Sequence, residues 1–401
     1  MLSIGAGQEQ VFSILEARAL GFTVIAVDGN ANAVGFQYAN YSFPIDLAEE
    51  RQIIELAKKY DVKFIIPSPI GRFLVTVGAV NDALNLPGVS KVAARILADK
   101  HLFSQLLNKL NMFTPTHRII NKPNLFTIMK EINTLSYPCI LKPVNGSGSR
   151  GVVTLYNNFN NDNLIEQHVS SLLTNENTVI EEYVIGTEYG VDCLIRNDNL
   201  EIVAVREKIM TNLPYRQEIG YITSFDIELE KNIAVEIQKI IDELKLNNCI
   251  MQVDLILLSN NFVYIIEAAA RPSGLRVTQN LLPFIVEESP VSILLKEVIK
   301  EKKSELSKKN SKFYGLFFFD FKEEGVLYRK PSSKEISKLK VITEYECNLN
   351  KGDKITVVKD GLGIYQRGYF IIEGDTKEEV IKNRIKILEL FLIKGGENNE
   401  L

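Results

Sequence analysis

The stretch Met251–Gly274, MQVDLILLSNNFVYIIEAAARPSG, predicts two apolar strands joined by a polar turn. Asparagine tolerates the left-handed backbone that a tight hairpin needs, so Asn260 and Asn261 are expected to form a two-residue turn. Such a turn places Asp254 directly opposite Glu267 and on the same face of the sheet. Because like charges placed opposite each other destabilise a strand pair, the two acids require an explanation.

Two explanations of this pair are open from the stretch alone. Its neighbours are apolar on both expected faces, so the acids would be partly desolvated, and a bound divalent cation would relieve their repulsion. Arg271 follows Glu267 four residues later and is available for an anionic ligand. The alternative is an ordinary buried hairpin whose acids lie at its solvated end.

Composition places the chain among ordinary soluble proteins. Its 401 residues are too many for one simple core and suggest two or three domains. With a net charge of -4 and no basic stripe, it lacks the electrostatic footprint of a nucleic-acid-binding protein. No apolar run has the length of a membrane span, and the first residues form a strand pattern, so we expect no membrane insertion and a cytoplasmic location.

Cysteine and histidine are too scattered for a disulfide frame, a zinc site or histidine-based catalysis. No CxxC pair occurs, and no two histidines have metal-ligand spacing. The residues concerned are Cys139, Cys193, Cys249, Cys347, His101, His117 and His168.

Residues 2 to about 90 alternate short apolar runs with helical patterns, which is typical of a doubly wound parallel sheet. Expected strands are Leu2–Ile4, Val24–Val27 and Phe64–Ile66, and expected helices are Gln8–Leu20 and Glu49–Tyr60. Gly5-Ala6-Gly7 and Asp28 resemble part of a dinucleotide fingerprint, but Gln10 stands at the third glycine position. A turn that lets helix and strand pack closely explains these glycines equally well.

The pattern predicts three domains: an N-terminal αβ domain at 1–90, a central α+β domain at 91–299 and a β-rich domain at 313–395. The central domain opens with a helical stretch, Lys91 to Leu110, and includes a subdomain at about 137–182. The charge run at 296–312 is typical of a solvated linker. The last domain ends in an amphipathic helix, Lys377–Leu392.

A glycine-rich segment, NGSGSRG at 145–151, follows the apolar strand Ile140–Pro143. Its backbone N–H groups can cradle a polyphosphate, although no Lys-Ser/Thr pair follows as in a P-loop. A hairpin with a glycine tip suits a lid over phosphates, while a flexible loop without a ligand is also common. Lys142, an isolated charge at the end of its strand, favours the ligand-binding interpretation.

Val179–Val184 is an apolar strand with two acids, Glu181 and Glu182, and Glu188 follows it. A strand that turns into a loop can offer backbone groups to a purine edge, and a later carboxylate can bind ribose hydroxyls. Taken alone, a charged surface strand explains this pattern better. Lys100 is one lysine among many, and only its place among the other elements makes it a candidate site residue.

In this order, the elements resemble the ATP-grasp superfamily over nearly the entire chain. The resemblance implies a central two-subdomain ATP-grasp fold with ATP bound between its halves. It also implies that Lys100 and Lys142 bind ATP and that Arg271 neutralises phosphate. By this resemblance, the lid would comprise Gly146, Ser147, Gly148, Ser149 and Gly151. The adenine and the ribose would be contacted by Glu181, Glu182, Val184 and Glu188, and Mg²⁺ (or Mn²⁺) would be bound by Asp254 and Glu267.

One departure concerns the metal site. Many members of the superfamily have E-x-N-x-R here, with the asparagine as a further metal ligand, whereas this chain has Ala269. Water, or Glu267 binding both ions, could fill the gap. Members with glycine or alanine at this position resemble the peptide-ligase branch.

The resemblance implies an ATP-dependent carboxylate–amine ligase that works through an acyl phosphate, with Lys142 and Arg271 as catalytic residues. The partners would be a small carboxylate and an amine, both amino acids, and resembling proteins are commonly homodimers. Two alternatives remain: a bicarbonate-activating carboxylase or carbamoyl-phosphate-type enzyme, and a non-catalytic nucleotide-binding regulator, prompted by Ala269. Candidate anchors for a substrate carboxylate are Arg206, Arg216 and Arg276.

Overall fold

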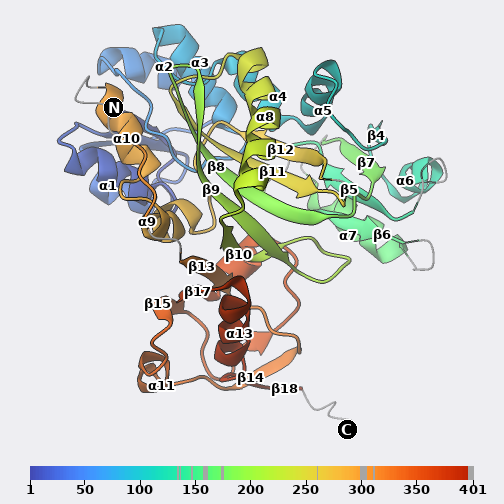
Figure 1. The fold of residues 1–401 in the computed structure, drawn as a ribbon. Helices are drawn as coiled ribbons and strands as arrows, with labels where there is room; N and C mark the ends of the chain where they lie inside the picture. Colours follow the sequence, from blue (N-terminus) through green and yellow to red (C-terminus); the bar gives the residue numbers. More distant parts are fainter. Residues whose placement is uncertain are drawn as a thin grey trace. The chain divides into compact units, whose positions relative to one another are not determined.

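The computed structural model describes residues 1–401 except 133–134, 136, 146–147, 157–160, 173–175, 260, 299–304, 310–311 and 396–401. Figure 1 shows the labelled helices and strands in chain order. The internal contacts divide the chain into two compact units. The first unit comprises Met1–Pro115, Val184–Val205 and Phe225–Lys309. The second unit comprises Thr116–Tyr183, Arg206–Ser224 and Asn310–Leu401.

The first unit begins with a three-stranded parallel sheet in the order β1-β2-β3. Its elements are β1 (Leu2–Ile4), α1 (Val11–Ala19), β2 (Ile25–Asp28), η1 (Val34–Tyr38), β3 (Tyr41–Pro44), α2 (Glu50–Lys59) and α3 (Leu74–Leu84). The predicted strand Phe64–Ile66 is reduced to one isolated parallel bridge between Ile65 and Leu2, in which Leu2 N donates to Phe64 O at 3.0 Å and Ile66 N donates to Leu2 O at 2.8 Å. This segment therefore pairs with β1 at a single position.

The glycine turn after β1 is closed by Asp28. Its carboxylate accepts hydrogen bonds from Ala6 N at 2.8 Å and from Asn30 N at 2.9 Å. Gly5 takes a φ of 94°, which glycine adopts without strain. The fingerprint-like residues therefore build the turn itself.

The helical stretch predicted from Lys91 to Leu110 is two helices, α4 (Lys91–Ala98) and α5 (Lys100–Lys109). Asp99 separates them, with an extended backbone at φ -108° and ψ 112°. Its side chain accepts hydrogen bonds from the N–H groups of His101 and Leu102 at 2.9 and 3.0 Å. An N-cap aspartate thus starts a new helix at Lys100.

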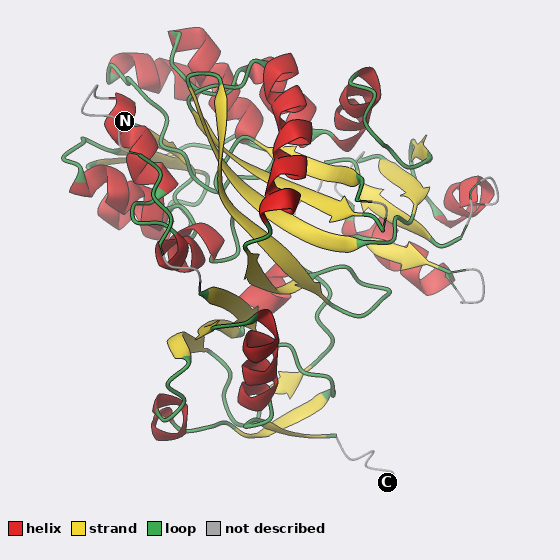
Figure 2. Ribbon diagram, viewed as in Figure 1, coloured by secondary structure: helices red, strands yellow, loops and turns green. Residues whose placement is uncertain are grey.

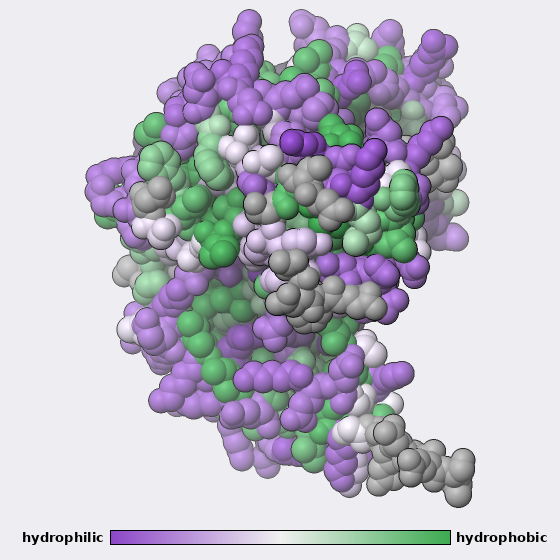
Figure 3. Space-filling view, turned by 90° about the vertical axis from the view of Figure 1, so that its right-hand side faces the viewer, coloured by the Kyte–Doolittle hydropathy of each residue, from purple (hydrophilic) through white to green (hydrophobic). Residues whose placement is uncertain are grey.

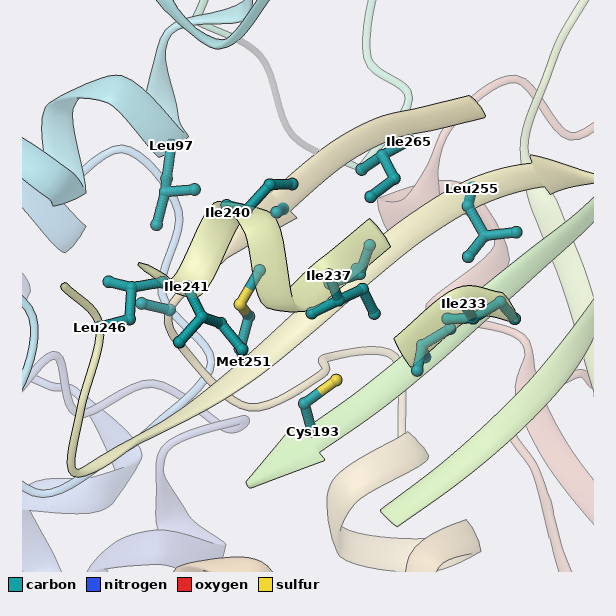
Figure 4. Packing of buried hydrophobic residues seen from close by; sticks show 14 of the residues in the cluster. Leu97, Cys193, Ile233, Ile237, Ile240, Ile241, Leu246, Met251, Leu255 and Ile265 are labelled. Carbon is teal, nitrogen blue, oxygen red and sulfur yellow. The ribbon is translucent and has the colours of Figure 1, made fainter. Parts of the chain in front are cut away.

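The larger sheet of the first unit runs β12-β11-β8, with each neighbouring pair antiparallel. The strands are β8 (Thr187–Arg196), β11 (Cys249–Leu257) and β12 (Val263–Ala269). Helix α8 (Ile227–Leu244) covers one face, and its buried isoleucines face Met251 and Leu255 of β11 (Figure 4). The unit also contains η2 (Val277–Leu281), α9 (Leu282–Ile285), α10 (Pro290–Val298) and the first residues of β9 (Asn199–Met210).

The second unit contains a four-stranded antiparallel sheet in the order β4-β7-β5-β6. Its strands are β4 (His117–Ile120), β5 (Cys139–Pro143), β6 (Val153–Leu155) and β7 (Thr178–Glu182). Helices α6 (Leu125–Ile132) and α7 (Asp162–Ser171) pack against these strands, and buried residues of both helices share a core cluster with the sheet. Figure 2 distinguishes the helices from the strands by colour. The predicted hairpin on either side of the glycine segment is confirmed by the pairing of β5 with β6.

The rest of the second unit is rich in strands. One group runs β10-β13-β17-β15 and packs against α13 (Lys377–Leu388); a smaller sheet runs β16-β14-β18. The remaining elements are β10 (Glu218–Ser224), β13 (Phe313–Phe318), β14 (Gly325–Arg329), α11 (Ser333–Ser337), β15 (Ile342–Cys347), β16 (Lys354–Ile355), α12 (Gly361–Tyr365), β17 (Gly368–Gly374) and β18 (Leu392–Lys394). The predicted fold class, a mixture of α/β and α+β with strand-rich C-terminal sequence, is confirmed.

The surface agrees with the composition. On the face shown in Figure 3, hydrophilic residues cover most of the surface and hydrophobic residues form separate groups. Among the helices of the described residues, none is both long and apolar enough to cross a membrane.

Candidate functional site

The hairpin of β11 and β12 pairs Asp254 with Glu267, as the sequence predicts. Next to the turn, however, Leu257 pairs with Val263, one position out of step with a two-residue turn. A register shift between Asp254 and Leu255 cancels this difference. Such a bulge places two residues of one strand opposite one residue of its partner.

The predicted two-residue turn is therefore wrong, and Asn260, one of its two residues, lies outside the described part. Leu258 N donates to Phe262 O at 2.9 Å, so three residues connect the strands. Asn261 has a left-handed φ of 64°, which is usual for the last residue of a three-residue hairpin loop. The opposed acids thus result from a longer turn and a bulge that offset each other.

One face of this sheet is polar. Residues paired across antiparallel strands share a face, and Gly190 and Asp192 of β8 lie opposite Asp254 and Gln252 of β11. Glu188 belongs to the same face, because it lies opposite Ile256. The neighbours on this face are therefore mixed, because Ile256, which is buried, and Ala269 lie on it beside the polar side chains, whereas the face under α8 is apolar.

The two carboxylates have different surroundings. Asp254 is only 6% exposed, and its Oδ1 accepts a hydrogen bond from Gln252 Nε2 at 3.0 Å. Glu267 is half-buried and has no ion-pair partner within the described part of the chain. Gly190 has no side chain to fill the space beside Asp254. Two acids are thus held side by side on a partly desolvated face.

This donor set fits a magnesium ion. Mg²⁺ is usually bound by one or two carboxylates, with phosphate oxygens and water completing the octahedron. No group of three or more His, Cys, Asp or Glu residues that could hold a metal occurs in the described sequence. Asp254 and Glu267 therefore suit an ion that arrives with a phosphate ligand better than an ion enclosed by protein alone.

Arg271 follows the end of β12. One of its terminal nitrogens, Nη1, donates to Pro272 O at 2.8 Å, while Nε is buried and has no hydrogen-bond acceptor within the described residues. A buried donor left unsatisfied costs about 1–3 kcal/mol, and more when it is charged. The guanidinium is therefore prepared to donate to an anion, and it lines a pocket in the first unit with Ala270, Asn248 and Ser68.

Four further predicted residues lie in the first unit. Glu188 occupies β8 two positions from Gly190, which is about 7 Å along a strand. Lys100 is the first residue of α5. Arg276 has a left-handed φ of 65° and lines a second pocket with Glu9, Ser273 and others. Val184 also belongs to this unit.

In the second unit, Lys142 and Glu181 form an ion pair. Glu181 pairs with Ile140, two residues before Lys142, so both side chains share the face of the sheet opposite α6 and α7. Each residue is 9% exposed. Lys142, which looks isolated in the sequence, is therefore a buried cation with a specific counterion.

The same face carries further polar groups. Thr154, opposite Ile140, has a buried Oγ1 without a hydrogen bond in the described structure. The guanidinium carbon of Arg216 lies 5.7 Å from the ring centroid of Tyr183. Glu182 N donates to Thr116 O at 3.0 Å, so this N–H is already engaged. This face of the sheet therefore carries the charged pair Lys142–Glu181 and the hydroxyl of Thr154.

Part of the predicted lid is described. Gly148, Ser149 and Gly151 have positive φ angles of 64°, 54° and 73°, while Gly146 and Ser147 lie outside the described residues. Gly361 N donates to Gly148 O at 3.1 Å. At Gly151, a Cβ would lie 2.1 Å from Ser171 Oγ, so this glycine permits a close approach to α7.

His168 supports the lid and was not singled out from the sequence. It is fully buried, and its two ring nitrogens lie within hydrogen-bond distance of Gly151 O and, at 2.8 Å, Thr178 Oγ1. Burial lowers the pKa of His168, while the bond to Gly151 and the charge of Glu176 oppose this shift. The neutral imidazole of His168 therefore holds the glycine segment through Gly151.

The lowered pKa of His168 predicts a pH-dependent loss of stability. Below the ordinary value of about 6.5, the unfolded chain binds a proton that folded His168 resists, so the free energy of unfolding falls as pH falls. His168→Gln lacks this contribution. The stability advantage of wild type over this variant, measured by urea unfolding, should shrink between about pH 7.5 and about pH 5.5. An advantage that grows over this range would contradict the assignment.

The other arginine candidates differ in exposure. Arg206 is 1% exposed, with its guanidinium carbon 4.9 Å from the ring centroid of Tyr221, so it is not a surface residue. Arg216 is half-buried.

Sequence reasoning did not find three polar residues of the first unit, which are Gln252, Asp192 and Ser273. Ser273 Oγ donates to Asp192 at 2.5 Å. Only the alternation Glu188-x-Gly190-x-Asp192 signals the polar face in the sequence.

Comparison with known proteins identifies the central segment. Residues 135–279 match the model of the ATP-grasp domain. Formate-dependent phosphoribosylglycinamide formyltransferase of Prochlorococcus marinus is 26% identical over 156 residues, which span 38% of each chain. D-alanine–D-alanine ligase A of Bacillus cereus is 28% identical over 168 residues, 41% of this chain and 53% of that protein.

A solved structure resembles the whole chain. The L-amino acid ligase of Bacillus licheniformis superposes with a TM-score of 0.78 at 18% sequence identity, covering 98% of both chains. At this identity the likeness establishes the fold. The resemblance to the ATP-grasp superfamily predicted from the sequence is confirmed.

Proposed function

We propose that this protein is an ATP-dependent carboxylate–amine ligase that joins two small molecules, both amino acids, because residues 135–279 match the model of the ATP-grasp domain. The names of two similar proteins, an L-amino acid ligase and a D-alanine–D-alanine ligase, support this substrate class. ATP is the proposed energy source and Mg²⁺ the proposed metal.

The observation that carries the proposal is the pairing of Asp254 with Glu267. Arg271, which has an unsatisfied N–H donor, follows Glu267 four residues later in the sequence. The two carboxylates offer oxygens to a divalent cation, and Arg271 Nε offers a buried N–H to an anion. Metal–phosphate chemistry needs both kinds of group, because phosphoryl transfer depends on positioning and charge neutralisation. No covalent nucleophile is required.

Each group has a proposed role. When bound to Asp254 and Glu267, Mg²⁺ would neutralise charge on the phosphates. Arg271 donates to the anion that is transferred. Lys142, held by Glu181, contacts the nucleotide, and Glu188 accepts from the ribose hydroxyls. Lys100, Glu182, Val184 and the glycine segment complete the proposed nucleotide contacts.

The proposed reaction balances in two steps. A carboxylate oxygen of the first substrate attacks the γ-phosphorus, and the bond to ADP breaks to give an acyl phosphate. The amine nitrogen of the second substrate then attacks the acyl carbon, phosphate leaves with the carboxylate oxygen, and a proton passes to solvent. A closed lid would keep water from the acyl phosphate.

An assay with pooled substrates tests the proposal. The protein is incubated with ATP, Mg²⁺ and pools of amino acids, with and without bicarbonate, while phosphate release and product mass are followed. We expect phosphate release that needs amino acids, with a product lighter by one water than its two substrates together. Release that needs bicarbonate would indicate a carboxylase instead. ATP binding without release in any pool would favour a regulator.

A further inference from the structure

The polar face around the proposed metal ligands contains one more oxygen donor. In the antiparallel register, Gln252 lies directly opposite Ala269 on β12 and opposite Asp192 on β8. Asp254 and Glu267 form the adjacent row of the same face. Ala269 contributes only a methyl group, so Gln252 supplies the amide in this row next to the two carboxylates, and it contacts Asp254 directly.

The hydrogen bonding of Gln252 leaves its oxygen available. Its Nε2 donates to Asp254 Oδ1 at 3.0 Å, and its Oε1 has no hydrogen bond within the described residues. Asp192, on its other side, already accepts a hydrogen bond from Ser273 Oγ. Gln252 is half-buried, so its amide is neither fully solvated nor fully paired.

We propose that Gln252 Oε1 is a third protein ligand of the divalent cation held by Asp254 and Glu267. Hard cations accept carboxamide oxygens as well as carboxylates and water. The same amide then orients Asp254 through Nε2 and binds the ion through Oε1. Position 269 faces the same space, so a carboxamide placed there on the neighbouring strand can substitute for Gln252. This inference rests on the proposed function, because it adds a ligand to the same metal site.

The test measures Mn²⁺ affinity of the full-length protein with a non-hydrolysable ATP analogue, by the electron paramagnetic resonance signal of free Mn²⁺. Gln252→Met keeps the length of the side chain but removes both amide groups. We expect it to weaken Mn²⁺ binding by about 10- to 100-fold, the loss typical when metal-site partners are removed. The double variant Gln252→Met/Ala269→Asn should regain most of the affinity.

A second variant separates binding the ion from orienting Asp254. Gln252→Glu keeps a ligand oxygen but cannot donate to Asp254, so it should bind Mn²⁺ at least as tightly as wild type. If it is as weak as Gln252→Met, Gln252 only positions Asp254, and the proposal is overturned. Unchanged binding by Gln252→Met, or no recovery in the double variant, would also overturn it.

Two controls complete the design. Gln238→Met changes a half-buried glutamine of α8 in the same unit, whose Nε2 donates to Asp242 Oδ1 at 2.7 Å, and it should leave Mn²⁺ affinity unchanged. Melting temperatures verify that every variant is folded. If wild type itself binds no Mn²⁺ with the nucleotide analogue, the metal assignment of the proposed function fails. If wild type binds Mn²⁺ and Gln252→Met binds it equally well, only the role of Gln252 fails.

Discussion

Glu267→Gln should lower Mg²⁺-dependent ATP turnover by about 10²- to 10³-fold, the size of loss seen when a group that stabilises transition-state charge is removed. The variant should nevertheless fold normally. Without metal it should be slightly more stable than wild type, by about 0.2–1 kcal/mol, because it removes a like charge directly opposite Asp254. Activity and stability therefore change in opposite directions.

Steady-state phosphate release and urea unfolding in EDTA measure the two effects. The matched control is Glu228→Gln, which alters an exposed carboxylate paired with Lys231 on α8 of the same unit. It should change neither activity nor stability appreciably. An active Glu267→Gln enzyme would refute the metal assignment. A variant that is both inactive and unstable would show that Glu267 acts in folding.

Lys142→Met should have the second largest effect, on stability as well as on nucleotide binding. It leaves Glu181 in a site that is only 9% exposed without its counterion. Breaking a buried ion pair by removing one partner typically costs about 3–5 kcal/mol, whereas replacing both partners with apolar residues is often neutral or stabilising. Lys142→Met/Glu181→Met should therefore recover the stability that Lys142→Met loses.

Nucleotide binding separates the structural from the functional role of this pair. If Lys142 contacts ATP, the double variant should be stable and yet fail to bind a fluorescent ATP analogue. Lys63→Met is the control for loss of an exposed pair, because Lys63 and Asp61 have side chains that are 72% and 81% exposed. It should cost less than about 1 kcal/mol. Normal nucleotide binding by the stable double variant would contradict the role of Lys142.

The sequence predicted the pair Asp254–Glu267 correctly, but by a route that the structure does not follow. A two-residue turn would give this pairing along the whole hairpin. The chain instead uses a longer turn and a bulge, and the two deviations cancel at Asp254. Bulges are common at the edges of sheets, where β12 lies, and they depend on the pairing of whole strands, so local turn residues do not reveal them.

Features that depend on distant residues were beyond sequence reasoning. The partner of Lys142 lies 39 residues away along the chain, and only strand pairing brings Glu181 beside it. The polar face likewise depends on the register between β8 and β11, which places Asp192 opposite Gln252. By contrast, helices and strands with local periodicity, such as α2 and α13, lie close to their predicted positions.

The break between α4 and α5 shows what a local signal can add. Asp99 is a favourable N-cap residue directly before Lys100, and this preference could have been read from the sequence. The apolar periodicity on either side of it suggested one continuous helix. At Phe64–Ile66 the apolar pattern predicted a full strand, whereas the chain forms one parallel bridge with β1.

The most direct test of the account is the fate of the carboxylate oxygen. The protein is incubated with ATP, Mg²⁺ and amino acids carrying ¹⁸O in their carboxylates, in unlabelled water, and the mass of the released phosphate is measured. A carboxylate–amine ligase that forms an acyl phosphate must transfer one ¹⁸O atom to each phosphate. Unlabelled phosphate, released while the amino acids are consumed, would contradict the proposed reaction.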